Sequence, residues 1–118
     1  MTLSIYVDGS GGDNSGYGYF VKETGESFYE KKQGITNNQA EYLGIISALK
    51  KFAQSSEDVT IYSDSKNTVS QLNHEFAINS EPLRELARES WTLMKTIPNL
   101  KITWIPRAQN MAGKMLGS

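Results

Sequence analysis

The stretch from Gly34 to Asp64, GITNNQAEYLGIISALKKFAQSSEDVTIYSD, decides the fold that we expect for this chain. Thr36, with Gln39 three residues later, is a capping-box pattern, and apolar residues then recur at helical spacing, which predicts an amphipathic helix over about 38–53. Residues 59–64 alternate between apolar and polar side chains, as in a strand. Because a further strand precedes the helix, this order implies a right-handed crossover and a parallel pair of strands.

Strands are expected on both sides of this unit. Residues 3–7 alternate in the same way, and two runs rich in aromatic residues, 16–22 and 26–33, flank a short connection that contains a glycine, as in a hairpin. Residues 100–104 alternate again near the carboxyl end. The predicted sheet is therefore mixed and five-stranded. Its first three strands form an antiparallel meander, and its first, fourth and fifth strands are parallel in the centre.

Further helices are expected in the second half of the chain. Ser65 is a plausible cap for a short helix over 65–72, and Ser80 with a following glutamate and proline begins a second one that ends near residue 97. The tail 108–118 is expected to form two to three helical turns. The predicted class is α/β, with helices flanking the sheet, in one domain over residues 1–118.

The amino-acid composition excludes several kinds of active site and of protein. The chain has 118 residues, 38% of them hydrophobic and 21% charged, with a net charge of -1, one histidine and no cysteine. The absence of cysteine excludes disulfides, thiol nucleophiles and zinc sites built on thiolates, so any metal must be held by carboxylates. The near-neutral charge argues against a strong non-specific nucleic-acid clamp. Because no apolar run is long enough to cross a bilayer and no signal pattern stands at the amino terminus, a cytoplasmic protein with no membrane partner is expected.

Three acidic residues are predicted to converge. Asp8 closes the first strand and Asp64 closes the fourth, and ligands of such sheets gather at the carboxyl ends of the parallel strands. Glu41 lies about one turn inside the long helix, on the side expected to face the sheet, where an unpaired charge is costly. Three such carboxylates repel one another unless a divalent cation neutralises them. Oxygen ligands without histidine or cysteine favour Mg²⁺ or Mn²⁺.

Several short strings resemble type 1 ribonuclease H in their order and spacing. The resemblance is greater to the compact, archaeal-like branch of that family. The strings are Tyr6 to Ser10, Gly16 to Gly18, Thr36 to Glu41, Tyr62 to Ser65 and Trp104 to Asn110. Thr-Asn-Asn-x-x-Glu is the most specific of them. The resemblance covers nearly the whole chain and implies a ribonuclease H-like fold. It also implies hydrolysis of the RNA strand of RNA/DNA hybrids with two magnesium ions, held by Asp8, Glu41 and Asp64 as catalytic and metal-binding carboxylates.

The same resemblance implies contacts with the substrate. Backbone groups of Gly9 and Ser10, and the side chains of Asn38 and Gln39, are expected to reach the hybrid, where 2′-hydroxyl groups distinguish RNA from DNA. Other residues are expected to meet phosphates or to add positive charge near the DNA strand: Asn14, Thr36, Lys66 and Arg107. For Thr36, a plain helix cap explains the residue equally well. The single His74 and the tryptophans Trp91 and Trp104 are expected to be structural, the tryptophans in the core.

The carboxyl terminus departs from the family pattern Asn-x-x-Ala-Asp-x-Leu. When the pattern is anchored on Asn110 and Leu116, Lys114 occupies the position of the fourth carboxylate, and a shift by one residue puts Gly113 there instead. Neither register supplies an acid. Two substitutes are conceivable at this stage: a neutral oxygen ligand from the Asn110 amide, or positive charge from Lys114 in place of part of the metal's role.

Three functions therefore stay open. The first is a metal-dependent endonuclease acting on RNA/DNA hybrids as a monomer with no obligate protein partner. The second is a module of the same fold that binds hybrids but cleaves them weakly or not at all. The third is a transposase or integrase core, which would cut duplex DNA, although such cores do not typically carry the string from Thr36 to Glu41.

Overall fold

The computed structural model describes residues 2–116, and for residues 114–116 it describes the backbone alone. Ten elements follow one another along the chain. They are β1 (Thr2–Ser10), β2 (Gly16–Val21), β3 (Ser27–Lys31), α1 (Asn37–Lys51), β4 (Asp58–Ser63), α2 (Lys66–Leu72), α3 (Glu81–Met94), β5 (Leu100–Trp104), the short 3-10 helix η1 (Arg107–Gln109) and α4 (Met111–Leu116).

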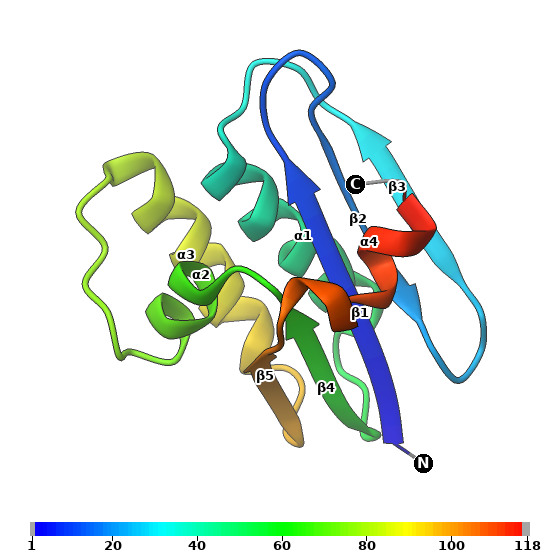
Figure 1. The fold of residues 1–118 in the computed structure, drawn as a ribbon. Coiled ribbons are helices and arrows are strands. Elements are labelled where there is room, and N and C mark those ends of the chain that lie inside the picture. The colour runs from blue at the N-terminus through cyan, green and yellow to red at the C-terminus, as the bar shows by residue number, and fades with distance from the viewer. Residues whose placement is uncertain (1, 117–118) are drawn as a thin grey trace.

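The five strands form one mixed sheet in the order β3-β2-β1-β4-β5 (Figure 1). Strands β1, β2 and β3 pair antiparallel, whereas β4 pairs parallel with both β1 and β5. This arrangement confirms the predicted α/β class, the meander and the parallel pairing of the first, fourth and fifth strands, but β5 lies at the edge of the sheet and not in its centre. It places the carboxyl ends of β1 and β4 side by side at one end of the sheet.

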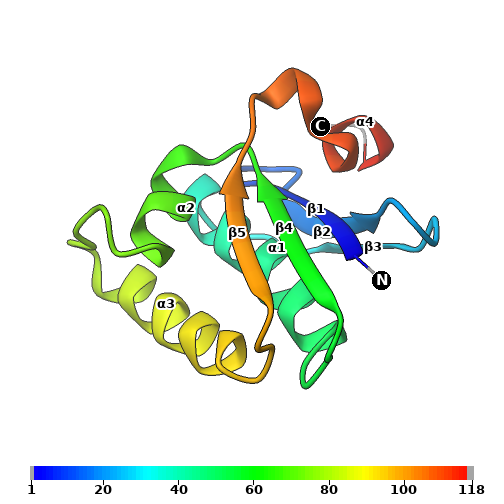
Figure 2. The same ribbon diagram turned by 90° about the horizontal axis from the view of Figure 1, so that it is seen from below.

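Helices cover the two faces of the sheet unequally (Figure 2). Helix α1 packs on one face against β1 and β2, and α3 packs against α1. Helix α4 lies on the opposite face, over β1 and β2. The core between α1 and the sheet is fully buried and includes Ile5, Val7, Ile45, Leu49 and Ile61. Burial of each such side chain stabilises the fold by about 1.5–3 kcal/mol.

Element boundaries differ from the predicted ones by a few residues. Helix α1 begins as the capping box predicts, because the Thr36 side chain accepts from the Gln39 backbone and the Gln39 side chain accepts from the Thr36 backbone. The predicted tail helix over 108–118 is divided into η1 and α4 at Asn110, and residues 117–118 lie outside the described part. Within residues 2–116, no helix has both the length and the apolar character required to cross a bilayer.

Strand β1 and helix α1 approach each other so closely at Gly9 and Gly44 that these two positions leave little or no room for a side chain. A Cβ atom on Gly9 would overlap the backbone carbonyl of Ala40, and one on Gly44 would lie 3.0 Å from the Asp8 carbonyl oxygen. The neighbouring turn is tied to the same helix, since the Gly11 amide donates to Asn37 Oδ1 at 2.6 Å. The glycines therefore set the distance between the end of β1 and the first turns of α1.

Replacement of Gly9 by alanine is expected to destabilise the protein by about 2 kcal/mol or more, because the added methyl group meets backbone atoms that cannot rotate away. Urea denaturation measures this loss. Gly44→Ala is the matched comparison: its contact is looser, and the gain in helix propensity, about 1 kcal/mol, opposes the loss. Equal stability of Gly9→Ala and the wild type would contradict this account of the close approach.

Candidate active site

Three carboxylates from three different elements converge at the end of the sheet. Asp8 lies near the end of β1, Asp64 directly follows β4, and Glu41 points from the second turn of α1. One carboxylate oxygen from each residue lies within 4.8 Å of the others. The parallel pairing of β1 with β4 and the close approach of α1 to β1 produce this cluster. The strand pairing and the orientation of Glu41 toward the sheet were predicted, whereas the close approach was not.

The cluster is poorly solvated. Asp8 is 6% exposed and Glu41 is 8% exposed, while Asp64 is half-buried. Burial, followed by the negative charge of Asp64, raises the pKa of Asp8 to about 6, although the Gly9 backbone and the positive charge of Arg107 oppose the shift. Burial, followed by the charges of Asp64 and Asp8, raises the pKa of Glu41 to about 8. Both carboxyl groups are thus held in an environment that disfavours their charge.

Hydrogen bonds hold Asp64 from two sides. Its carboxylate accepts from the Asn110 side-chain amide, with 3.0 Å between Oδ2 and Nδ2. Its backbone carbonyl accepts from the Trp104 indole at 3.2 Å. On the other side of the cluster, the Ser63 hydroxyl lies 3.5 Å from Glu41 Oε2. Neutral donors therefore face the carboxylates of Asp64 and Glu41, and a third one holds the Asp64 backbone.

The donor set fits a hard divalent cation. The cluster offers only carboxylate oxygens, which Mg²⁺ and Mn²⁺ prefer over nitrogen or sulfur. The burial of these carboxylates, together with their mutual repulsion, is the observation in this structure that calls for such an ion, since a bound cation would offset the cost of charging them. Asp8, Glu41 and Asp64 are accordingly the residues that could hold it.

The predicted substrate-contacting residues surround the cluster in part. Gly9 and Ser10 end β1 beside it, and exposed Asn38 lies in the first turn of α1. Gln39 uses its side-chain oxygen in the helix cap, so its amide nitrogen is the group left to face a substrate. Thr36 caps α1, because its side-chain oxygen accepts from the Gln39 backbone amide and its own backbone amide donates to the Gln39 side chain. Its role as a cap is therefore confirmed, and its contact with a phosphate remains a prediction.

Three further predicted residues, Asn14, Lys66 and Arg107, are exposed. Asn14 lies in the turn between β1 and β2, and Lys66 begins α2 two residues after Asp64. Arg107, in η1, is close enough to Asp8 to lower its pKa, which places a positive charge at the rim of the cluster. Lys114 belongs to α4, but its side chain lies outside the described residues.

Asn110 lies beside the cluster and uses both groups of its side-chain amide. Its side-chain oxygen accepts from the Ala112 backbone amide at 3.0 Å and so begins α4. Its side-chain nitrogen faces the Asp64 carboxylate. In this arrangement the oxygen accepts from the start of the helix, and a contribution of Asn110 as a neutral ligand of a metal stays a prediction.

Two residues near the site were missed or misplaced by sequence reasoning. Trp104, expected in the core, is 44% exposed, because it is the last residue of the edge strand β5. Asn37 was not assigned a role, yet it joins the β1–β2 turn to α1 through Gly11. The only sequence signal for a role of Asn37 is its place in the Asn-Asn pair that follows Thr36. Nothing in the alternation of β5 indicates that Trp104 reaches Asp64.

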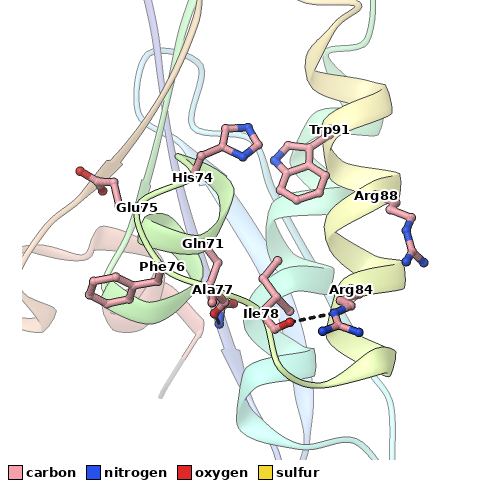
Figure 3. Close-up of a pocket in the computed structure, with 9 residues that line it drawn as sticks. All are labelled: Gln71, His74, Glu75, Phe76, Ala77, Ile78, Arg84, Arg88 and Trp91. Atoms are coloured by element: carbon pink, nitrogen blue, oxygen red, sulfur yellow. Dashed lines mark hydrogen bonds between the residues drawn. The ribbon is translucent and has the colours of Figure 1, made fainter.

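A separate cavity of about 450 Å³ lies between the end of α2 and α3 (Figure 3). His74 stacks on Trp91 with ring centroids 4.9 Å apart, which agrees with the predicted structural role of both residues. Arg84 donates to the Ile78 carbonyl at its edge, and Arg84 and Arg88 both pair with Glu81. The three carboxylates do not line this cavity, so it is not the site they form.

Comparison with known proteins shows relatives in sequence and in fold. The model of a family described as reverse transcriptase-like matches residues 22–117, a range that includes Glu41 and Asp64 and begins after Asp8. The "Putative hydrolase EbsB" of Enterococcus faecalis is 34% identical over 123 residues, and the match covers 97% of this chain and 90% of that protein.

Solved structures of two ribonucleases H are similar to this one. The RNase H1 of the halophilic archaeon Halobacterium salinarum has a TM-score of 0.84 and 27% identity, with 93% of this chain and 89% of that chain covered. LC11-RNase H1, solved in complex with an RNA/DNA hybrid, has a TM-score of 0.85 and 25% identity, with 97% and 92% covered. These similarities show the ribonuclease H fold and support a hydrolytic, ribonuclease H-type function.

The raised pKa of Glu41 predicts a pH dependence of stability in the absence of divalent ions. Between about pH 4.5 and about pH 8 the folded protein retains a proton that the unfolded chain has released, so stability falls as pH rises through this range. Glu41→Gln removes the penalty and is expected to raise the free energy of unfolding at about pH 8 by about 1 kcal/mol or more. Urea denaturation in a chelator at several pH values measures the effect.

The same substitution at an exposed glutamate of α3, Glu85→Gln, is the control and is expected to leave the pH dependence unchanged. Parallel pH profiles for Glu41→Gln and the wild type would show that burial of this carboxyl group carries no such penalty.

Proposed function

The chain belongs to the reverse transcriptase-like family and has the ribonuclease H fold, and from this premise we propose that it is an endonuclease that hydrolyses the RNA strand of RNA/DNA hybrids with Mg²⁺ or Mn²⁺. The observation that carries the proposal is the cluster of Asp8, Glu41 and Asp64, which this fold places at the carboxyl ends of its parallel strands. The hybrid bound to LC11-RNase H1, a relative of the same fold, supports the substrate class.

In this proposal the three carboxylates are the catalytic and metal-binding groups. When bound, divalent ions would supply the activation of a water nucleophile and the stabilisation of the leaving 3′ oxygen. The protein's own contribution is to fix the three oxygens in one place and to keep neutral donors, Asn110 and Ser63, around them. A preformed arrangement of this kind spares reorganisation when the phosphodiester is attacked.

Recognition of the RNA strand is assigned to the start of α1 and the end of β1. Asn38 is exposed in the first turn of α1, Gln39 is partly exposed with its side-chain oxygen used in the cap, and Gly9 and Ser10 follow Asp8 at the end of β1. Groups at these places can meet 2′-hydroxyls and base edges in the minor groove of a hybrid. Because the 2′-hydroxyl is the feature that separates RNA from DNA, these contacts would select the strand that is cut.

We assign the binding of substrate phosphates to polar and basic residues around the cluster. Asn14 and Thr36 would receive a phosphate of the DNA strand, because both lie in exposed segments near the start of α1. Lys66 and Arg107 would add positive charge on the side of Asp64 and Asp8. Few cations are involved, so binding should depend only moderately on salt concentration.

A second candidate function is a hybrid-binding module with weak or absent turnover. The observation that favours it is the lack of any acidic residue from Ala108 to Ser118, where the family pattern has its fourth carboxylate. Lys114 stands in that position in one register. Under either function we propose a single domain over residues 1–118 that acts as a cytoplasmic monomer, without an obligate protein partner.

The test is cleavage of a labelled RNA/DNA hybrid beside RNA/RNA and DNA/DNA duplexes, in Mg²⁺ and in Mn²⁺. The wild type is expected to cut the hybrid alone. Asp8→Asn is expected to lower kcat/KM by about 100-fold or more, which corresponds to about 2.7 kcal/mol of lost transition-state stabilisation. The matched control is Asp58→Asn, since Asp58 is exposed and begins β4 at the opposite end of that strand.

Three other outcomes would contradict this proposal. Binding of the hybrid without cleavage in either metal would contradict the enzyme and favour the binding module. Cleavage of the DNA/DNA duplex would favour a transposase- or integrase-like core. Equal loss of activity in Asp8→Asn and Asp58→Asn would remove the carboxylate cluster from the mechanism.

A further inference from the structure

Asn110 joins three segments that meet behind the carboxylates. Its side chain is fully buried, and its amide nitrogen lies 2.8 Å from the Val7 carbonyl oxygen of β1 and 3.0 Å from Asp64 Oδ2. Its oxygen accepts from the Ala112 amide at the start of α4. One short side chain thus contacts β1, the residue after β4 and the last helix.

The chemistry of its neighbours fixes the orientation of the amide. The Val7 carbonyl can only accept a hydrogen bond and the Ala112 N–H can only donate one, so the NH₂ group must face Val7 and the oxygen must face Ala112. The second hydrogen of the same NH₂ group then points at Asp64. An amide turned the other way would place two acceptors against each other at Val7 and two donors at Ala112.

We infer that Asn110 is a positioning residue, which sets the place of the Asp64 carboxylate relative to β1. Asp64 follows the end of a strand and is half-buried, so its side chain needs an external contact to hold one rotamer. Val7 directly precedes Asp8, and a bridge from the Val7 carbonyl to Asp64 Oδ2 therefore fixes the spacing of the two aspartates. A hydrogen bond to an ionised carboxylate is among the stronger ones in proteins.

The bridge leaves the other oxygen of Asp64 for a cation. A neutral donor on Oδ2 holds the carboxylate without competing for the charge of the ion, as partners of metal ligands commonly do. In this respect the inference rests on the proposed function, because the ion belongs to that proposal. The geometric part of the inference, the coupling of Asn110 to Asp64, needs no ion.

Titration calorimetry with Mn²⁺ alone tests the effect on the site. Asn110→Ser keeps an acceptor that can cap α4 but is too short to bridge Val7 and Asp64. It is expected to weaken Mn²⁺ binding about 10-fold, and to lower kcat on the hybrid by about as much while KM changes less than about twofold, since the substrate contacts lie elsewhere. Ile97→Val, a core substitution remote from the carboxylates, controls for lost stability.

Unchanged Mn²⁺ affinity in Asn110→Ser would overturn the inference, as would an equal loss in Ile97→Val. A double-mutant cycle in a chelator provides the second measurement. The loss of stability caused by Asn110→Ser is expected to shrink when Asp64 is already alanine, because the partner is then absent. Additive losses would also overturn the coupling.

The two proposals can fail separately. Should the wild type bind Mn²⁺ and leave hybrids uncut, the nuclease proposal fails, and the calorimetric comparison still decides the role of Asn110. Should the wild type bind no Mn²⁺, the metal-dependent function fails, and the cycle in chelator decides whether Asn110 positions Asp64.

Discussion

Mutual repulsion of three carboxylates is the constraint on which the architecture of this end of the molecule depends. Asp8, Glu41 and Asp64 bring oxygens within 4.8 Å of one another in a region where two of the side chains are nearly excluded from water. Such a cluster opposes folding when all three groups are charged and no cation is present. Natural sequences retain an unfavourable arrangement of this kind where function requires it, and the surrounding contacts hold it in place.

Those contacts come from backbone geometry more than from side-chain charge. Parallel pairing of β1 with β4 aligns the two aspartates, and the glycines at positions 9 and 44 let α1 approach β1 closely enough to add Glu41. Buried Tyr42, the next residue of α1, donates to the Gln71 side chain of α2 at 2.7 Å, which links the helix that carries Glu41 to the helix that follows Asp64. The site is therefore a property of packed elements, as precise sites generally are.

Much of this could be predicted from the sequence, because the signals were local or periodic. Alternation identified β1 and β4, the capping box identified the start of α1, and the order of elements gave the parallel pair that brings Asp8 and Asp64 together. The resemblance to ribonuclease H, drawn from short strings, is confirmed by the family match and by the solved relatives. Contacts between distant segments were not predictable. The orientation of the Asn110 amide depends on Val7, more than a hundred residues away, and the exposure of Trp104 depends on β5 being an edge strand.

The central claim is that the three carboxylates form a site for a divalent cation. Anomalous diffraction from crystals grown with Mn²⁺ tests it most directly, because the signal locates the ion independently of any assay. We expect a peak at about 2.1 Å from oxygens of Asp8, Glu41 and Asp64, close to the ligand distance of a small hard cation. An anomalous map with no peak among these residues, whether or not Mn²⁺ is bound elsewhere on the protein, would contradict the claim.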